Sequence, residues 1–220
     1  MPTISDVKSP PRLSRNANTP RPKTGIVHLG PGAFFKGFNA VFSQNAMQAA
    51  GGEWGICAVS LRSARSRDDL MPQDMLYHSV TLGPDGMSAA VVECLSDVMV
   101  APENPAAVLV QMARSETKIV SLTITEKGYC HAPATGRLRR DDLDIEHGLV
   151  TPDAPRTAIG FLVHALAKRR LNGDQPFTFL SCDNLPDNGQ LMRSVVLDLA
   201  NLLDPGLSAW IAQNVAFRST

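Results

Sequence analysis

The sequence lacks an excess of charge of either sign, and this limits its partners. Its 220 residues carry 21 lysines and arginines against 21 aspartates and glutamates, so the formal net charge is zero. Strong binding to nucleic acid or to an anionic membrane needs a basic surface, so we expect neither partner. No apolar run approaches the ~18 residues of a membrane-spanning helix, so we expect no integral membrane protein.

The sequence also lacks the cysteine and histidine spacings that mark disulfide frameworks and metal sites. The four cysteines, with no C-x-x-C pair, are Cys57, Cys94, Cys130 and Cys182. The five histidines share no metal-ligand spacing, so we expect no metal site. His28 lies on a predicted buried strand and is expected to be a hydrogen-bonded core residue. Scattered cysteines are typical of a reducing compartment, which predicts a cytoplasmic protein.

Residues 1–23 differ in composition from the rest of the chain. They hold five prolines and five basic residues but almost no large apolar side chains. Such a segment cannot bury enough apolar surface to offset the entropy lost on ordering. We therefore predict a flexible tail over residues 1–23 and one folded domain over residues 24–220.

From residue 24 onward, short apolar runs alternate with helical patterns. The apolar runs predict buried strands over residues 25–30, 55–60, 118–123 and 177–181. The helical patterns predict helices over residues 33–50, 105–113, 155–171 and 190–203. In the first of these helices, an apolar stripe consists of Phe35, Phe38, Val41, Phe42, Ala46 and Ala49.

Two further segments, residues 77–82 and 89–95, predict an antiparallel hairpin around Gly83-Pro84-Asp85-Gly86 at one end of the sheet. The remaining strands alternate with helices and are almost continuously apolar. Strands of that kind are buried on both faces, as in parallel sheets. The sequence therefore predicts an α/β fold, with a doubly wound and mainly parallel sheet covered by helices on both faces.

Gly30 and Gly32 form a turn between the first predicted strand and the first predicted helix. Gly30 suits a tight turn, and Gly32 has no Cβ to keep a phosphate from the backbone. The helix start points its free amides at the same place, which makes those of Ala33, Phe34 and Phe35 candidates for binding a pyrophosphate. The pattern G-x-G-x-x-G is incomplete because Phe35 takes the third glycine position. A tight turn that binds nothing is the alternative.

The second predicted strand is followed by an arginine, where an acid would favour NAD. The segment Ser60-Leu61-Arg62 offers no carboxylate for the adenosine ribose, and an arginine there tolerates a 2′-phosphate. In the alternative interpretation, Arg62, Arg65 and Arg67 form a solvated face with neighbouring aspartates. The choice between NAD and NADP stays open.

Two strands end in polar segments: residues 121–129 read SLTITEKGY, and residues 181–189 read SCDNLPDNG. Ligands of open α/β sheets bind beyond the carboxyl ends of the strands. Thr125 and Glu126 could hold a cofactor ribose or amide, and Asn184 could donate to a carbonyl oxygen that gains charge during hydride transfer. Alternatively, Asp183 and Asn184 make turns and helix caps, and Glu126 forms an exposed ion pair.

Together these segments resemble the amino-terminal domain of the mannitol dehydrogenase family, long-chain polyol dehydrogenases that include mannitol 2-dehydrogenase and fructuronate reductase. The matching segments are residues 26–34 (IVHLGPGAF), 54–62, 73–77, 121–129 and 181–189. The resemblance implies a Rossmann-like domain of a metal-independent, NAD(P)-dependent oxidoreductase. Its substrate would be a small sugar polyol or hexuronate, with mannitol/fructose and mannonate/fructuronate as the possible pairs.

The resemblance also assigns site residues. Asn184 matches the asparagine that helps to polarise the reacting carbonyl, and Thr125 and Glu126 lie near the nicotinamide. The full set of predicted cofactor contacts is Gly30, Gly32, Ala33, Phe34, Phe35, Arg62, Thr125, Glu126 and Asp183, with no metal ligand.

The sequence departs from the family in two ways. Where the family commonly has His-Arg-Ala-His, this chain has Phe35-Lys36-Gly37-Phe38, so both histidines are lost while Lys36 keeps a positive charge. The family's helical C-terminal domain carries the general-base lysine and most substrate contacts, and we expect that domain to be absent here. The isolated chain is then predicted to bind nucleotide without turnover. A non-catalytic nucleotide-binding or interaction module is the alternative.

Overall fold

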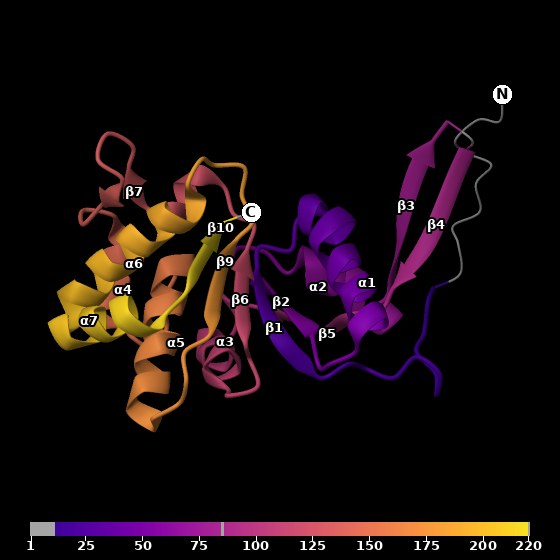
Figure 1. The fold of residues 1–220 in the computed structure, drawn as a ribbon, viewed down its shortest axis with the longest axis horizontal. Helices are drawn as coiled ribbons and strands as arrows, with labels where there is room; N and C mark the ends of the chain where they lie inside the picture. The colour runs from indigo at the N-terminus through magenta and orange to yellow at the C-terminus, as the bar shows by residue number, and fades with distance from the viewer. Residues whose placement is uncertain (1–11, 85, 220) are drawn as a thin grey trace.

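The computed structural model describes residues 12–84 and 86–219. At its centre is a six-stranded sheet in which all neighbouring strands are parallel (Figure 1). The strands are β1 (Thr24–Leu29), β2 (Gly55–Ser60), β5 (Leu95–Val100), β6 (Ile119–Leu122), β9 (Thr178–Ser181) and β10 (Phe217–Ser219). They lie in the order β10-β9-β6-β1-β2-β5, so the chain begins in the middle and reverses direction once. This is the order of dinucleotide-binding domains, with its switch between β1 and β6.

Helices cover both faces of the sheet, which confirms the predicted fold class (Figure 1). One face carries α3 (Pro105–Ala113), α5 (Ala158–Asn172), α6 (Asn188–Leu203) and α7 (Pro205–Asn214). The other carries α1 (Ala40–Ala50) with the π-helix η2 (Phe35–Asn39) before it, and α2 (Arg65–Leu70) with η3 (Met71–Gln73). In the sequence, the 3₁₀ turn η4 (Glu126–Tyr129) and α4 (Leu143–Val150) come between β6 and β9. Within the described ranges, no helix is long and apolar enough to cross a membrane.

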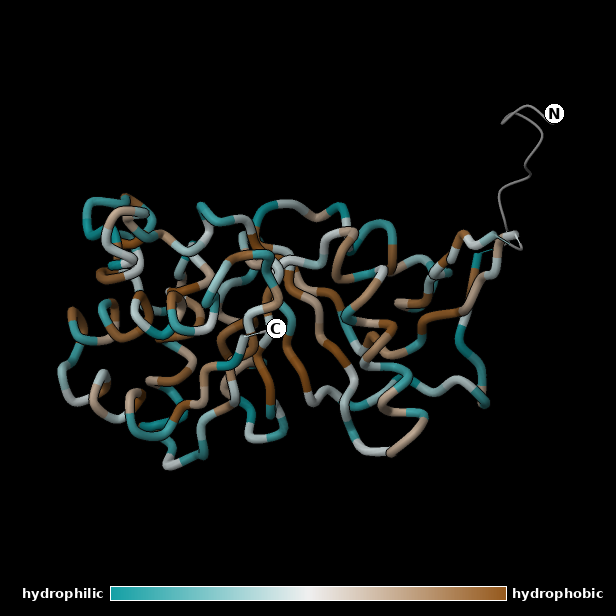
Figure 2. The backbone as a smooth tube through the Cα atoms, turned by 45° about the horizontal axis from the view of Figure 1, so that its top comes forward, coloured by the Kyte–Doolittle hydropathy of each residue, from teal (hydrophilic) through white to brown (hydrophobic). Residues whose placement is uncertain are grey.

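The sheet separates two hydrophobic cores. Alternate side chains of β1 point to opposite faces, so Val27 and Leu29 join the larger core under α3, α5 and α6, while Ile26 packs on the smaller core under α1 and α2. The strands form the hydrophobic centre of the backbone tube (Figure 2). Full burial of each large apolar side chain contributes about 1.5–3 kcal/mol, so these strands hold the domain together.

The smaller core covers only part of its face of the sheet. Beyond β1 this face opens into a groove of about 240 Å³ whose apolar walls include Ile26, Phe42, Ile119 and Leu180. The topology explains the opening. The chain reverses its direction at β1, and right-handed crossovers then place the helices that follow β6 and β9 on the opposite face.

The apolar stripe predicted for the first helix is largely exposed. Phe35 is buried, but Phe38 is 52% and Phe42 66% exposed, so the stripe does not face the core along its whole length. Ala46 and Ala49 also face solvent. The helix begins as the π-helix η2, whose longer turn shifts the stripe out of register, and the sheet below it is partly uncovered.

Several boundaries differ from the predicted ones. The hairpin consists of β3 (Tyr77–Gly83) and β4 (Gly86–Val92), and it stands on the far side of α1 from the sheet (Figure 1). The second hairpin strand, predicted over 89–95, therefore ends early, because the chain from Leu95 onward pairs with β2 as the edge strand β5. Asp85, in the predicted turn, lies outside the described residues.

The helix predicted from residue 155 begins later, at Ala158. The hydroxyl of Thr157 caps it by accepting the amide of Gly160 at 3.0 Å, so Pro155 lies before the helix. Its predicted end is confirmed, because Gly173 caps it with φ of 75°. The structure adds elements that were not predicted. Among them are α2, α4, α7, β5, β10 and a small hairpin of β7 (His131–Ala132) and β8 (Arg137–Leu138).

Residues 12–23, the described part of the predicted tail, contact the domain. Arg15 Nη2 donates to the carbonyl oxygens of Glu93 at 2.8 Å and Leu95 at 2.9 Å. The flexible tail was predicted from the small number of apolar side chains in this segment, and such a count takes no account of hydrogen bonds like these. The rest of the predicted tail, residues 1–11, lies outside the described residues.

Candidate functional site

The candidate residues follow four neighbouring strands. The glycine turn comes after β1, Arg62 after β2, Thr125 and Glu126 after β6, and residues 183–184 after β9. These strands are consecutive in the sheet, in the order β9-β6-β1-β2, and all are parallel. Their carboxyl ends therefore share one edge, on both sides of the switch between β1 and β6. We call this edge the candidate site.

The backbone at Gly30 requires glycine, which confirms the predicted tight turn. Its φ is +90°, and its amide donates to the carbonyl oxygen of Val59 at 2.9 Å. A Cβ at this position would lie 2.3 Å from the carbonyl oxygen of Thr123. Gly30 thus lets the end of β1 turn sharply while it touches the loop after β6.

Gly32, by contrast, faces open space. A Cβ built on it would meet only the carbonyl oxygen of Gly30, at 3.9 Å. The helical hydrogen bonds begin with the amide of Lys36, which donates to the carbonyl oxygen of Gly32 at 3.1 Å. The amides of residues 33–35 precede this first bond, and helix starts present such amides to outside acceptors. The turn therefore offers an uncrowded cradle for an anionic group.

The two phenylalanines after this turn have different environments. Phe35 is buried and stacks on His28, with ring centroids 3.9 Å apart and an interplanar angle of 14°. Phe34 is 53% exposed and stacks on Phe38 at 5.0 Å. The third glycine of the usual pattern permits close helix–strand packing. Here the ring of Phe35 occupies that space, which explains why the glycine is missing.

The loops after β6 and β9 lie side by side. The amide of Thr123 donates to the carbonyl oxygen of Leu29, and the amide of Cys182 donates to that of Leu122, both at 3.0 Å. Beyond these bonds, Thr125 and Glu126 are exposed, as is Asn184. The Asn184 amide therefore stands in solvent at the end of β9, where it can reach a bound molecule.

Asp183 joins the two loops. Its Oδ2 accepts the phenol of Tyr129 at 2.8 Å, and its carboxylate also accepts the amide of Ile124. Its backbone carbonyl accepts the side-chain amide of Asn188 at 2.6 Å. Burial raises the pKa of Asp183 to about 6, although the bonds from Tyr129 and Ile124 oppose that rise. The carboxylate is thus engaged within the protein, next to Asn184.

The raised pKa makes stability depend on pH. Because the folded-state pKa lies above the ordinary value of 3.8, the native state holds the proton more tightly, and its free energy of unfolding falls as pH rises from about 4 to 6. Partial solvation limits this loss to about 1–2 kcal/mol. The variant Asp183→Asn should not show this loss of unfolding free energy when urea unfolding is measured at pH 4, 5, 6 and 7. Parallel pH profiles for the two proteins would contradict this expectation.

The arginines after β2 divide into two kinds. Arg65 lies 3.8 Å from Asp69, and Arg67 pairs with Asp68 and Glu103, as the solvated-face interpretation predicts. Arg62 is exposed directly after β2, at the candidate site. Of the three, Arg62 therefore lies at the candidate site itself.

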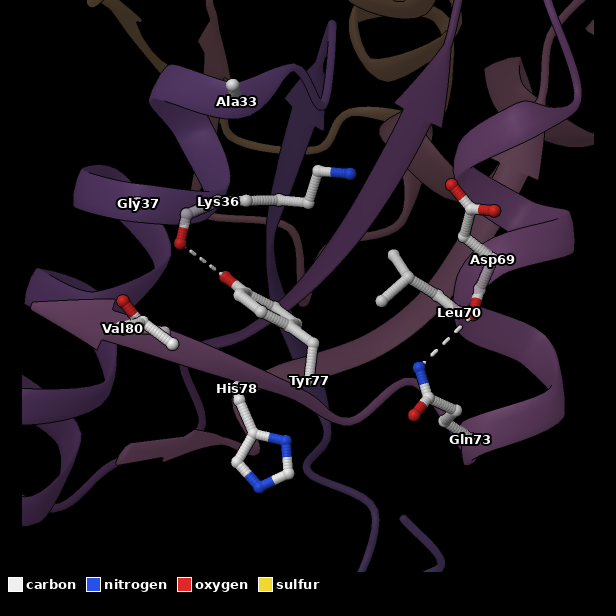
Figure 3. Close-up of a pocket in the computed structure, with 10 residues that line it drawn as sticks. Ala33, Lys36, Gly37, Asp69, Leu70, Gln73, Tyr77, His78 and Val80 are labelled. Atoms are coloured by element: carbon white, nitrogen blue, oxygen red, sulfur yellow. Dashed lines mark hydrogen bonds between the residues drawn. The ribbon is translucent and has the colours of Figure 1, made fainter. Parts of the chain in front are cut away.

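A pocket of about 420 Å³ lies behind the helix start, between η2, α2 with η3, and β3 (Figure 3). Inside it the phenol of Tyr77 donates to the carbonyl oxygen of Lys36 at 2.7 Å. Burial raises the pKa of Tyr77, so the phenol keeps its proton and this bond. The structure describes all of the predicted cofactor contacts, and Ala33 is the only one of them that lines this pocket. This pocket is therefore separate from the loops after β6 and β9.

The described part of the chain contains no set of side chains that could bind a metal ion. Residues 12–84 and 86–219 contain no group of three or more His, Cys, Asp or Glu side chains able to hold an ion. All four cysteines are free and buried. Burial raises the pKa of Cys57 and of Cys94 to about 12, so these thiols stay protonated at neutral pH.

Sequence reasoning missed three residues that shape the site. Thr123 and Tyr129 lie in the polar segment after β6, where the predicted contacts were Thr125 and Glu126. Ser181 contacts the phenol of Tyr129 at 2.5 Å. The signal was the density of hydroxyl groups in residues 121–129, together with Ser181 at the start of the second segment, which indicates hydrogen bonding between neighbouring loops rather than to solvent alone.

The mannitol dehydrogenase Rossmann domain is the sequence family that matches this chain, over residues 24–220. The uncharacterized oxidoreductase YeiQ of Escherichia coli K12 is 41% identical, in an alignment that covers 100% of this chain and 46% of that protein. The D-mannonate oxidoreductase of the same organism is 39% identical, over 91% of this chain and 42% of its own. The chain thus spans less than half the length of these curated relatives.

A solved structure is similar in both sequence and fold. The mannitol 2-dehydrogenase of Pseudomonas fluorescens, in a ternary complex with NAD and D-mannitol, has a TM-score of 0.85 and 39% identity. The superposition covers 89% of this chain and 41% of that one. The range matched by the family includes the glycine turn and both polar loops.

Proposed function

This chain belongs to the mannitol dehydrogenase family, and from that premise we propose that it is the coenzyme-binding part of an NAD-dependent oxidoreductase. The reaction interconverts a secondary alcohol and a ketone on an acyclic sugar polyol or hexonate, the substrate classes named in its relatives. One observation carries the proposal: the open glycine turn and the two polar loops meet at the switch point of the sheet. We also propose that the protein works in the cytoplasm, where buried, reduced cysteines are typical.

The glycine turn is proposed to hold the coenzyme pyrophosphate. Gly32 leaves the backbone open, and the amides of Ala33, Phe34 and Phe35 donate to the phosphate oxygens. Seen from the turn, the continuous helix over residues 33–50 presents the positive end of its dipole. Both features suit two linked phosphates better than a neutral ligand.

The loops after β6 and β9 are proposed to bind the nicotinamide end of the coenzyme and the substrate. NAD supplies the hydride acceptor when bound. The exposed amide of Asn184 donates to the substrate oxygen and stabilises the charge that develops on it. Thr125 and Glu126 line the nicotinamide side, while Asp183, predicted as a cofactor contact, holds the Asn184 loop through Tyr129. The proton is handled by the lysine of a helical C-terminal domain.

The coenzyme is proposed to be NAD, which the solved relative binds, with NADP tolerated. Arg62 supports this tolerance, because it is exposed at the end of β2 and no acid stands beside it in the segment 60–62. A carboxylate there would bind the ribose hydroxyls and repel a 2′-phosphate.

A substitution at Gly32 tests the proposed cradle. In Gly32→Val the side chain fills the space at the turn, so NADH should bind at least about tenfold more weakly in calorimetry. The matched control is Gly37→Val, on the helix that follows the turn, where a Cβ meets nothing within 4 Å. Equal NADH affinities of the two variants would contradict a pyrophosphate site at the turn.

The groove beside α1 is proposed to receive the helical C-terminal domain of the family. Relatives are more than twice as long as their matching part, so they contain chain enough for such a domain. The exposed rings of Phe34, Phe38 and Phe42 stand along one helix, and Phe42 also lines the groove. Contiguous apolar surface of this kind marks an interface.

This exposed face gives an expectation for the chain alone. At concentrations of tens of micromolar it should self-associate, and light scattering should report a mass above 23.7 kDa. The double variant Phe38→Ser/Phe42→Ser should scatter as a monomer. The control Leu171→Ser removes a side chain that is 86% exposed at the end of α5, and it should associate like the parent. A monomeric parent would contradict the expectation.

A further inference from the structure

His28 links the glycine turn to the loop after β6. It lies on β1 with no exposed surface, opposite Ser121 of β6 in the sheet register. Its Nδ1 is 2.9 Å from the hydroxyl of Ser121, and its Nε2 is 3.0 Å from the hydroxyl of Thr123. The Thr123 hydroxyl is in turn 2.7 Å from the carbonyl oxygen of Gly30.

The direction of these three bonds is set by the donors available. A carbonyl oxygen only accepts, so Thr123 donates its single hydroxyl proton to Gly30. Thr123 must then accept from His28, which places a proton on Nε2. In a neutral ring Nδ1 is bare and accepts the hydroxyl proton of Ser121. The resulting chain of hydrogen bonds ends at the turn.

The surroundings keep the ring neutral and in place. Burial lowers the pKa of His28 to about 3, although the nearby backbone of Gly30 opposes the change. Phe35 stacks on the ring from the helix that follows the turn. His28 therefore connects three parts of the candidate site: the carbonyl that shapes the turn, the start of the helix, and the strand end that precedes Thr125.

The Gly30 carbonyl is the point on which the geometry depends. It accepts the Thr123 hydroxyl and also the amide of Gly32, each at 2.7 Å. With both bonds made, the peptide plane between Gly30 and Pro31 is fixed, and so is the direction in which the next amides point. Loss of the hydroxyl leaves one of these two constraints.

We propose that His28 is a positioning residue, and that the chain Ser121–His28–Thr123–Gly30 fixes the glycine turn for the coenzyme phosphates. The role in binding rests on the proposed function. A histidine that merely fills the core would satisfy its own nitrogens without setting the orientation of the turn. The two roles predict different effects on coenzyme binding when the last hydroxyl of the chain is removed.

Three variants of the full chain test the proposal. Thr123→Val removes the hydroxyl at nearly constant volume, and NADH should bind about tenfold more weakly. Thr123→Ser restores the hydroxyl and should return the affinity to within about twofold of the parent. The control Thr24→Val removes a hydroxyl that pairs with Ser96 at 2.7 Å at the opposite end of β1, and it should leave NADH affinity unchanged.

Nuclear magnetic resonance provides a readout that does not need NADH. The ring ¹⁵N shifts of His28 should show a protonated Nε2 and a bare Nδ1, and the amide of Gly32 should exchange faster in Thr123→Val than in Thr24→Val. A protonated Nδ1, or equal exchange and equal NADH affinity in those two variants, would overturn the proposal. If the parent fails to bind NADH, the proposed function fails, while the ring shifts and the exchange rates still decide on the hydrogen-bond chain.

Discussion

The substitution Gly30→Ala is expected to lower the free energy of unfolding by about 4 kcal/mol, measured by urea unfolding. The new methyl group would enter a backbone with φ of +90°, which L-residues adopt only under strain. It would also lie 2.3 Å from the carbonyl oxygen of Thr123, a backbone atom that cannot swing aside. Relief of that overlap has to separate the end of β1 from the loop after β6.

Gly51→Ala is the matched control for this substitution. Its φ is +70°, but nothing lies within 4 Å of the added Cβ, so only the backbone strain remains. A loss of about 1–2 kcal/mol is expected there. If Gly30→Ala cost no more than Gly51→Ala, the close approach of the turn to Thr123 would be refuted.

The second large effect is expected at Arg169, where replacement by alanine should cost about 4–5 kcal/mol of unfolding free energy. The side chain is 1% exposed. Its guanidinium donates to the carbonyl oxygens of Gln175 at 2.6 Å and Thr117 at 2.5 Å, and also to that of Arg114. These carbonyls would lose their partners inside the protein.

The surroundings explain how a cation is held there without a carboxylate bonded to it. Arg114 caps the C-terminal end of α3, and Arg169 lies in the last turn of α5, so the negative ends of two helix dipoles converge on the guanidinium. Its carbon also lies 5.1 Å from the ring centroid of Phe177, which adds a cation–π contact. Burial still lowers the pKa of Arg169, as expected for a desolvated cation.

The adjacent Arg170 is the control for Arg169→Ala. It is partly exposed and pairs with Asp204 at 2.7 Å on the surface. Removal of an exposed ion pair of this kind costs about 1 kcal/mol or less. Losses of similar size at the two positions would contradict the role assigned to the buried guanidinium.

The sequence predicted the central strands and the place of the candidate site because each carries a local signal. An apolar run that ends in glycine predicts the turn at Gly30 without knowledge of the sheet. The parallel fold then requires the polar segments after β6 and β9 to meet at one edge. Elements with such signals, including α3 and α6, were placed within a residue or two of their bounds.

Other features depend on tertiary structure and have no local signal. The exposure of Phe38 and Phe42 results from a π-helix and from the open half of one sheet face. The bond between Tyr129 and Asp183 joins residues 54 positions apart. In the same way, Arg15 lies in a segment whose composition suggests a tail, while its guanidinium bonds to the backbone beside β5.

An NADH titration of the ¹⁵N-labelled chain, with an NADPH titration beside it, tests the central claim most directly. Saturable shifts should appear first at the amides of Ala33, Phe34 and Phe35, and then at Thr125 and Glu126. Weaker binding of NADPH would fit NAD as the coenzyme, and equal binding would fit the tolerance assigned to Arg62. Shifts confined to the pocket at Tyr77, or no saturable shift at all, would contradict a coenzyme site at the glycine turn.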